Sequence, residues 1–209
     1  TALVYNNYQN PISAASSQDE MEALADLAIE HDLWVLSDDA YYEIRYTDDP
    51  PRSIVNIPGM KERTVILYTF SKKFAMTGWR VGASIGPSEV INQIARFNIN
   101  DESCTNHFIQ HALAETVGGD SSGANELSSE LQARRDETIK GLNAIDGIHV
   151  PTPESTFYSY PNVSTVMANK GFTDLDKFRT SALEATGVSF CARHHFGTPL
   201  ADETDHYIR

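Results

Sequence analysis

Short runs of apolar residues alternate with polar and helix-like segments through the first half of the chain. The apolar runs are residues 1–6, 33–37, 64–69 and 81–85. Between the first two, Met21, Leu24 and Ala28 recur at helical spacing, which predicts a helix from about residue 18 to residue 31, capped by Ser16 or Ser17. Short buried strands with intervening helical segments are typical of an α/β layer with a largely parallel sheet.

Turn-forming residues divide the rest of the chain. Asp48-Asp49-Pro50-Pro51 predicts a loop, and the helical region from 88 to about 117 is predicted to break near 98–104. The Gly- and Ser-rich segment 118–123 is the best candidate for a linker, so we expect two domains, residues 1–118 and 119–209. In the second, α+β domain we expect helices near 124–145 and 173–186 and short strands at 148–150, 156–160, 188–191 and 207–209.

The composition limits the classes of partner. The 209 residues carry a net charge of −13 with scattered basic residues, whereas binding of nucleic acid needs a basic face. A salt-adapted source organism remains an open explanation of the acidity. No stretch is apolar enough to predict a membrane span. The spacing of Cys104 and Cys191 is not that of metal ligands, and two cysteines suggest no disulfide framework. The protein is therefore expected in a reducing cytoplasm.

Reactive side chains concentrate in the segment Thr69-Phe70-Ser71-Lys72-Lys73, which directly follows an apolar run. A lysine near a cationic neighbour or in a desolvated pocket loses its proton more easily and becomes a nucleophile toward carbonyls. Arg80, eight positions after Lys72, offers a fork suited to bidentate phosphate binding, and Thr69 adds a hydroxyl. This pattern favours a site for a phosphorylated aldehyde held as a Schiff base. A strand-to-strand loop with a chance basic pair is the alternative.

Three further polar residues follow or end predicted strands. Asp38 stands at the end of the second strand. A carboxylate buried there is costly without a cationic partner, and a protonated pyridine nitrogen would be such a partner. The alternative role for Asp38 is helix capping, which would suit Asp39 equally. Asn10, in an Asn-Pro turn after the first strand, can donate to a phenolate oxygen and a carboxylate. Arg209 ends the last predicted strand, and would either bind a substrate carboxylate or lie at a frayed terminus.

Together these segments resemble the class I/II aminotransferases, which use pyridoxal 5'-phosphate (PLP) and have PLP-dependent transferase fold type I. The resemblance covers essentially the whole chain. It implies that residues 1–118 are the later part of a large PLP-binding domain and that 119–209 are an incomplete small C-terminal domain. It implies a cytoplasmic homodimer that moves an amino group between an L-amino acid and a 2-oxo acid. A fragment lacking the N-terminal part and the extreme C-terminus is expected.

The resemblance also implies a role for each candidate residue. Lys72 would be the Schiff-base lysine that moves a proton between the substrate and the cofactor, and Asp38 would pair with the pyridine nitrogen. The remaining contacts would be made by Tyr41 and Asn10 to the ring oxygen, by Thr69 and Arg80 to the phosphate, and by Arg209 with Asn10 to the substrate carboxylate.

The chain departs from the family pattern in two respects. Asn10-Pro11-Ile12-Ser13 stands where many members have Asn-Pro-Thr-Gly, and the glycine-containing helix start that cradles the phosphate is absent. The chain alone is therefore expected to bind PLP weakly or not at all.

No metal is expected, because the pair His107 and His111 has no apparent third ligand. A PLP-dependent β-lyase or decarboxylase of the same fold, and a non-catalytic effector-binding or dimerisation domain, remain alternatives, and the amino acid is not specified.

Overall fold

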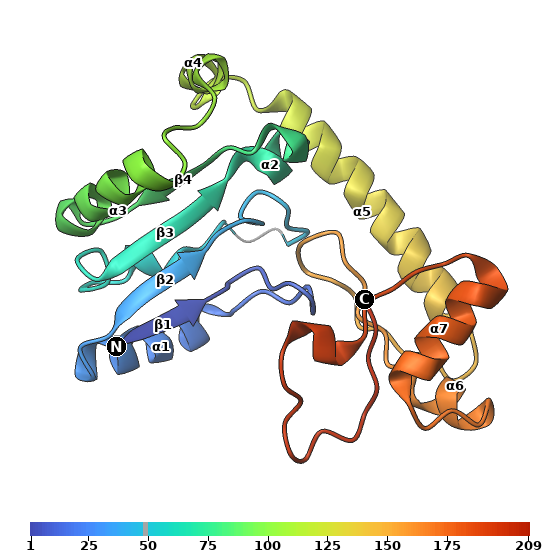
Figure 1. Cartoon of the computed structure of the whole chain (residues 1–209). Helices are drawn as coiled ribbons and strands as arrows, with labels where there is room; N and C mark the ends of the chain where they lie inside the picture. The colour runs from blue at the N-terminus through green and yellow to red at the C-terminus, as the bar shows by residue number, and fades with distance from the viewer. Residues whose placement is uncertain (48–49) are drawn as a thin grey trace.

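The computed structural model describes residues 1–47 and 50–209, so Asp48 and Asp49 of the predicted loop lie outside the described residues. Its central feature is one four-stranded sheet, ordered β1-β2-β3-β4 (Figure 1). The strands are β1 Ala2–Tyr5, β2 Trp34–Asp38, β3 Thr64–Thr69 and β4 Gly82–Ile85. All four lie where the apolar runs predict them, and the fold is α/β.

The first three strands are parallel, as expected, whereas β4 runs antiparallel to β3. A parallel crossover needs a dozen or more residues, usually with a helix that crosses the sheet. The β3–β4 connection holds only the short helix α2 (Phe70–Lys73) and the 3-10 turn η2 (Thr77–Trp79), and β4 therefore starts at the edge where β3 ends. The carboxyl ends of three strands and the start of the fourth meet at one edge of the sheet.

Helix α1 (Gln18–Glu30) covers one face of the sheet (Figure 1). It begins with a capping box: the Ser17 hydroxyl accepts from the Glu20 N–H at 3.2 Å, and the Glu20 carboxylate accepts from the Ser17 N–H at 2.7 Å. Its apolar stripe forms the main core with residues of the strands and of the 54–60 segment. The buried members of this core are Tyr5, Met21, Ala25, Ala28, Val35, Ile54 and Met60.

The opposite face of the sheet is much more open. Side chains alternate along a strand, so Val4 and Leu67 point away from the α1 core. Val4 is 71% exposed and Leu67 39% exposed, in contrast to Val35 on the α1 side, which is fully buried. The described residues therefore bury one face of the sheet well and the other only in part.

The second half of the chain is mainly helical. Its helices are α3 Ser88–Asp101, α4 His107–Thr116, α5 Ser122–Asn143, α6 Ser164–Asn169 and α7 Leu175–Thr186. The break between α3 and α4 falls near the predicted position, and α6 was not predicted. A second apolar cluster, Val163, Met167, Leu175 and Ala192, joins α6 and α7 to the C-terminal segment. No helix among the described residues is long and apolar enough to cross a membrane.

The short strands predicted for residues 148–209 were wrong. The structure has single bridges there, joining His149 to Asn162, Asn162 to Tyr207 and Ala192 to Ile208. Pro151, Pro153 and Pro161 interrupt these segments, and proline has no N–H for a ladder. The division into domains at residue 118 stays a prediction.

The α1 capping box gives a stability prediction. Ser17→Ala removes an accepted hydrogen bond at the helix start and should lower the free energy of unfolding by about 1 kcal/mol. Ser121→Ala is a matched control, because Ser121 precedes α5 at the same position and its side chain makes no capping bond. Its effect should stay within about 0.5 kcal/mol. Urea unfolding measures both variants, and equal losses would contradict the assignment.

Candidate active site

The end of the chain returns to the loop that follows β1. The Arg209 guanidinium donates a hydrogen bond from Nη1 to Oδ1 of Asn10 at 2.9 Å, across 199 positions of sequence. Figure 1 shows the carboxyl ends of β1 to β3 directed toward the region that holds the C-terminus. Two residues predicted from opposite ends of the sequence therefore lie in direct contact.

Asn6 connects the loop after β1 with the end of β2. Its carbonyl oxygen accepts from the Asn10 backbone N–H at 3.2 Å, and its amide nitrogen donates to the Asp38 backbone oxygen at 3.2 Å. One carboxylate oxygen of Asp38 accepts from the Ala40 N–H, also at 3.2 Å. Asn6 thus links Asn10 to the residue predicted to face a cationic ring nitrogen.

The neighbouring Asp39 has a different environment. Its side chain is buried with 4% exposure and accepts a hydrogen bond from the Ser37 hydroxyl at 2.8 Å. Burial raises the pKa of the Asp39 carboxyl, and the Ser37 hydrogen bond offsets part of that rise. The two adjacent aspartates are therefore distinguished by the structure, with Asp39 held inside the fold.

The two adjacent lysines are distinguished as well. Thr69 caps α2, because its hydroxyl oxygen accepts from the Ser71 N–H at 3.2 Å, and this helix carries both lysines. Lys73 Nζ lies 3.1 Å from the Glu43 carboxylate and forms an ion pair. Among the described residues no acid pairs with Lys72.

Aromatic rings surround the Lys72 amine. Its Nζ lies 5.7 Å from the ring centroid of Tyr41 and 5.6 Å from that of Phe157. Tyr41 in turn meets both Phe157 and Tyr158 edge to face. The amine is partly shielded from water, and among the described residues no carboxylate engages it, so it is available to a ligand.

A pair of phenols lies between Lys72 and Arg209. The hydroxyls of Tyr41 and Tyr158 share a short hydrogen bond. The Arg209 guanidinium carbon lies 4.3 Å from the Tyr158 ring centroid and 4.7 Å from that of Phe196, within cation–π range. Burial, followed by the bond to Tyr158, raises the pKa of Tyr41 above its ordinary value. At neutral pH Tyr41 is thus a neutral phenol that can donate a hydrogen bond.

Thr69 and Arg80 lie beside this network without a direct contact to it in the described residues. The Thr69 hydroxyl also donates a hydrogen bond to the Val81 carbonyl oxygen at 3.4 Å. Arg80 is exposed at the end of η2, and its guanidinium donates to the Thr77 carbonyl at 2.9 Å. These hydrogen bonds and cation–π contacts therefore connect five predicted site residues, with Asn6 and Tyr158 as connecting residues: Asn10, Asp38, Tyr41, Lys72 and Arg209.

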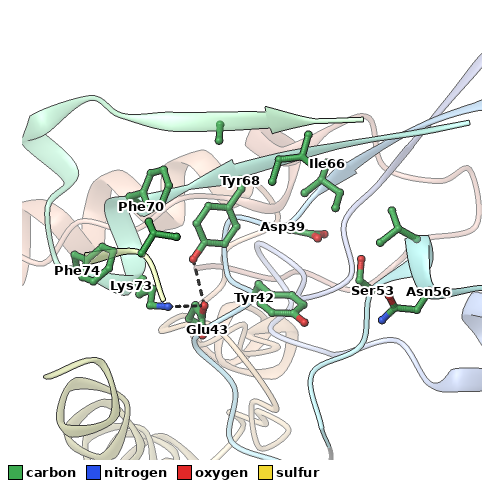
Figure 2. Close-up of a pocket in the computed structure, with 14 residues that line it drawn as sticks. Asp39, Tyr42, Glu43, Ser53, Asn56, Ile66, Tyr68, Phe70, Lys73 and Phe74 are labelled. Carbon is green, nitrogen blue, oxygen red and sulfur yellow. Dashed lines mark hydrogen bonds and ion pairs between the residues drawn. The ribbon is translucent and has the colours of Figure 1, made fainter. Parts of the chain in front are cut away.

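A cavity of about 380 Å³ beside β3 and β4 is separate from this network (Figure 2). Its wall is largely apolar and includes Ile66, Phe70 and Phe74, and no predicted site residue lines it. Figure 2 shows Lys73 and Tyr68 both directed at Glu43, which accepts from the Tyr68 hydroxyl at 3.3 Å. Lys73 and Glu43 thus neutralise each other in this cavity, and Asp39, which also lines it, is bonded to Ser37.

One cluster among the described residues has donor atoms close enough for a metal: Asp176, His194 and His195. Asp176 is already engaged by Arg179 at 3.2 Å and by His194 at 3.1 Å. The Nδ1 atom of His195 accepts from the Ala192 N–H, so the proton of the neutral ring lies on Nε2. A nearby guanidinium and a protonated nitrogen both disfavour a bound cation.

Sequence reasoning missed four contributors to the site: Asn6, Phe157, Tyr158 and Phe196. A signal existed for Asn6, which stands at the end of the first predicted strand as Asp38 stands at the end of the second. The aromatic residues gave no such signal, because aromatic side chains in short extended segments are as common in cores as in sites.

Comparisons with known proteins show which family the chain resembles. The family model for aminotransferase class I and II matches residues 1–203. The chain is 36% identical over 192 residues to the aromatic-amino-acid aminotransferase 2 of Thermococcus litoralis, covering 90% of this chain and 49% of that protein. It is 33% identical over 199 residues to the asparagine–oxo-acid transaminase of Streptococcus mutans, covering 94% and 50%.

Solved structures give the same result. The aromatic aminotransferase from Pyrococcus horikoshii superposes with a TM-score of 0.89 at 33% identity, covering 100% of this chain and 54% of that one. The N-succinyldiaminopimelate aminotransferase from Mycobacterium tuberculosis superposes with a TM-score of 0.89 at 27% identity, covering 99% and 52%. The chain thus spans about half the length of the relatives it matches.

The contrast between the two aspartates gives a pH prediction. A raised pKa means that the folded state keeps the Asp39 proton to higher pH than the unfolded chain does. The associated stability is present below the ordinary value of 3.8 and is lost as the pH rises through the raised value. Asp39→Asn removes this titration, so its unfolding free energy relative to wild type should increase with pH across that window.

Urea unfolding of both proteins at a series of pH values measures this difference, in which the titrations of groups that do not interact with Asp39 cancel. Ser37→Ala is the second variant. It removes the hydrogen bond that lowers the Asp39 pKa and should therefore extend the loss of stability to higher pH. A difference between Asp39→Asn and wild type that does not vary with pH would show that burial does not perturb this carboxyl.

Proposed function

The chain belongs to the aminotransferase class I and II family, and on that premise we propose that the protein containing it moves an amino group from an amino acid to a 2-oxo acid with PLP as cofactor. The observation that carries the proposal is the position of Lys72. Its amine lies against two aromatic rings, while the adjacent Lys73 is neutralised by Glu43. The contacts that start at Tyr41 lead through Tyr158 to Arg209.

The chemistry of the available side chains fits PLP group by group. PLP has an aldehyde, a phenolic oxygen, a ring nitrogen and a phosphate. The chain offers an amine without an acid partner among the described residues (Lys72), a neutral phenol (Tyr41) and a carboxylate at a strand end (Asp38). Thr69 and Arg80, on either side of Lys72, add a hydroxyl and an exposed guanidinium for the phosphate.

When bound, PLP supplies a carbonyl that captures amines and a ring that accepts electrons. Lys72 would provide the amine that holds the cofactor, and its Nζ would then carry a proton to and from the substrate. Asp38 would keep the ring nitrogen protonated by Coulomb attraction. Tyr41 would donate from its hydroxyl to the ring oxygen, as its neutral state allows.

Arg209 would bind the α-carboxylate of the amino acid. Its guanidinium is positioned by three contacts, with the amide oxygen of Asn10 and with the rings of Tyr158 and Phe196. A guanidinium in a fixed plane recognises a carboxylate through two parallel hydrogen bonds. Asn10 would support this carboxylate and the ring oxygen. These residues would recognise the carboxylate of an amino acid or oxo acid. Other groups would recognise the side chain of that substrate.

The assembly and location of the protein are also proposed. A homodimer is supported by large exposed apolar side chains on α3 and α4, where Phe97 is 74% and Phe108 60% exposed. A cytoplasmic location is supported by two free cysteines, Cys104 and Cys191. The net charge of −13 argues against a nucleic-acid partner. The transaminase names of the relatives favour amino-group transfer over a lyase or a non-catalytic module.

The roles of the two lysines can be separated by mutation. In the native gene product, Lys72→Ala should abolish the visible absorption band that forms on addition of PLP and should lower transamination by about 10²- to 10⁴-fold or more. Lys73→Ala should keep the band, because its amine is committed to Glu43. Absorption spectra with added PLP, before and after an amino acid and then a 2-oxo acid, measure this.

Lys73→Ala also controls for damage to α2, since both lysines occupy the same short helix. The band of the wild type should bleach with the amino acid and return with the oxo acid. A Lys72-dependent band that the amino acid does not bleach would refute amino-group transfer. A band that survives Lys72→Ala and disappears with Lys73→Ala would overturn the assignment of the reactive amine.

A further inference from the structure

Tyr158 touches both ends of the candidate site. Its hydroxyl shares a hydrogen bond with the hydroxyl of Tyr41, and its ring lies 4.3 Å from the guanidinium carbon of Arg209. Tyr41 also lies next to the Lys72 amine, whereas Arg209 also binds Asn10. Among the described residues, Tyr158 therefore joins the predicted cofactor side of the site to the predicted carboxylate side by direct contacts.

The backbone of Tyr158 is held in place by two side chains. Its carbonyl accepts from the Ser13 hydroxyl at 3.0 Å, and its N–H donates to the Thr156 hydroxyl at 3.2 Å. These two hydroxyls also bond each other at 2.6 Å and are buried. Ser13 and Thr156 both have a φ of 60°, in the left-handed region that non-glycine residues seldom adopt. The position of Tyr158 is therefore determined by the fold.

The direction of the phenol–phenol hydrogen bond depends on what Tyr41 does. A phenol has one proton to donate. When Tyr41 donates that proton to a ligand oxygen, it can only accept from Tyr158, so Tyr158 becomes the donor. The Arg209 guanidinium packs against the ring of this donor, 4.3 Å from its centroid, and fixes the plane in which the Tyr158 hydroxyl lies. Two hydrogen bonds would then run in one direction, from Tyr158 to Tyr41 and on to the ligand.

We infer that Tyr158 is a positioning residue: its ring holds the carboxylate-binding guanidinium of Arg209, and its hydroxyl strengthens the hydrogen bond that Tyr41 donates to an anionic ring oxygen of the cofactor. This inference rests on the proposed function. Its two parts involve different atoms of one side chain. They can therefore be separated by removing the hydroxyl alone or the whole ring.

The test compares Tyr158→Phe with Tyr158→Leu in the native, PLP-loaded gene product. Tyr158→Phe keeps the ring, so the KM for the amino acid should change less than about threefold. It loses one hydrogen bond that favours the anionic oxygen, so the pH midpoint of the visible band should rise by about half a unit to one unit. Tyr158→Leu loses both functions and should additionally raise KM about threefold to thirtyfold.

Two controls address a merely structural effect. Tyr46→Phe removes a phenol that bonds the Thr156 carbonyl in the same region, and it should leave the spectral midpoint unchanged. Tyr41→Phe removes the acceptor of the proposed hydrogen bond. In that background a further Tyr158→Phe change should not move the midpoint, whereas a general loss of stability would add to it.

The outcomes separate the inference from the proposed function. A wild-type protein without a Lys72-dependent band would contradict the proposed function itself. A normal wild-type band whose midpoint is the same in Tyr158→Phe, or a shift of equal size in the Tyr41→Phe background, would overturn the hydroxyl part. An unchanged KM in Tyr158→Leu would overturn the ring part.

Discussion

Parallel pairing of β1, β2 and β3 is the constraint on which the whole site depends. In parallel strands all carboxyl ends fall at one edge of the sheet, so the loop with Asn10, the residue Asp38 and the α2 helix with Lys72 must be neighbours. The antiparallel return of β4 brings Arg80 to that edge too, because the intervening connection is too short to cross the sheet. Open α/β sheets bind their ligands at this edge for the same geometric reason.

Electrostatics then assigns different tasks to chemically identical neighbours. Glu43 neutralises Lys73, and the aromatic rings around Lys72 leave its amine without such a partner among the described residues. In the same way, the buried Asp39 carboxylate accepts a hydrogen bond from the Ser37 hydroxyl. Asp38 lies at the strand end, where its backbone oxygen accepts from Asn6 and its carboxylate accepts from the Ala40 N–H. Pairs that are ambiguous in sequence become distinct once burial and partners are known.

The large sheet could be predicted from sequence because its strands are continuous apolar runs bounded by turn residues; the predicted bounds of β3, Thr64–Thr69, match the structure residue for residue. The start of α1 could be predicted for the same local reason, with Ser16 or Ser17 as the cap, and the structure identifies Ser17. The short strands after residue 148 could not be predicted reliably, since a few apolar residues among prolines form bridges or strands according to their partners.

Site residues were predictable to the extent that a motif carries them. Lys72, Asp38 and Asn10 stand after strands in recognisable segments, and the structure brings them to one edge, although their roles stay predictions. Tyr158 could not be found this way, because its significance arises from a contact with Tyr41 across 117 positions of sequence. Long-range contacts of single aromatic side chains leave no periodic pattern.

The central claim is that Lys72, and not its neighbour, holds the cofactor. Borohydride reduction of the PLP-loaded native gene product makes the lysine–cofactor bond permanent, and peptide mapping by mass spectrometry then locates the pyridoxyl group. The account predicts that the group lies on Lys72, in the peptide that contains Thr69 to Arg80. Finding it on Lys73, or on a lysine outside this segment, would contradict the account.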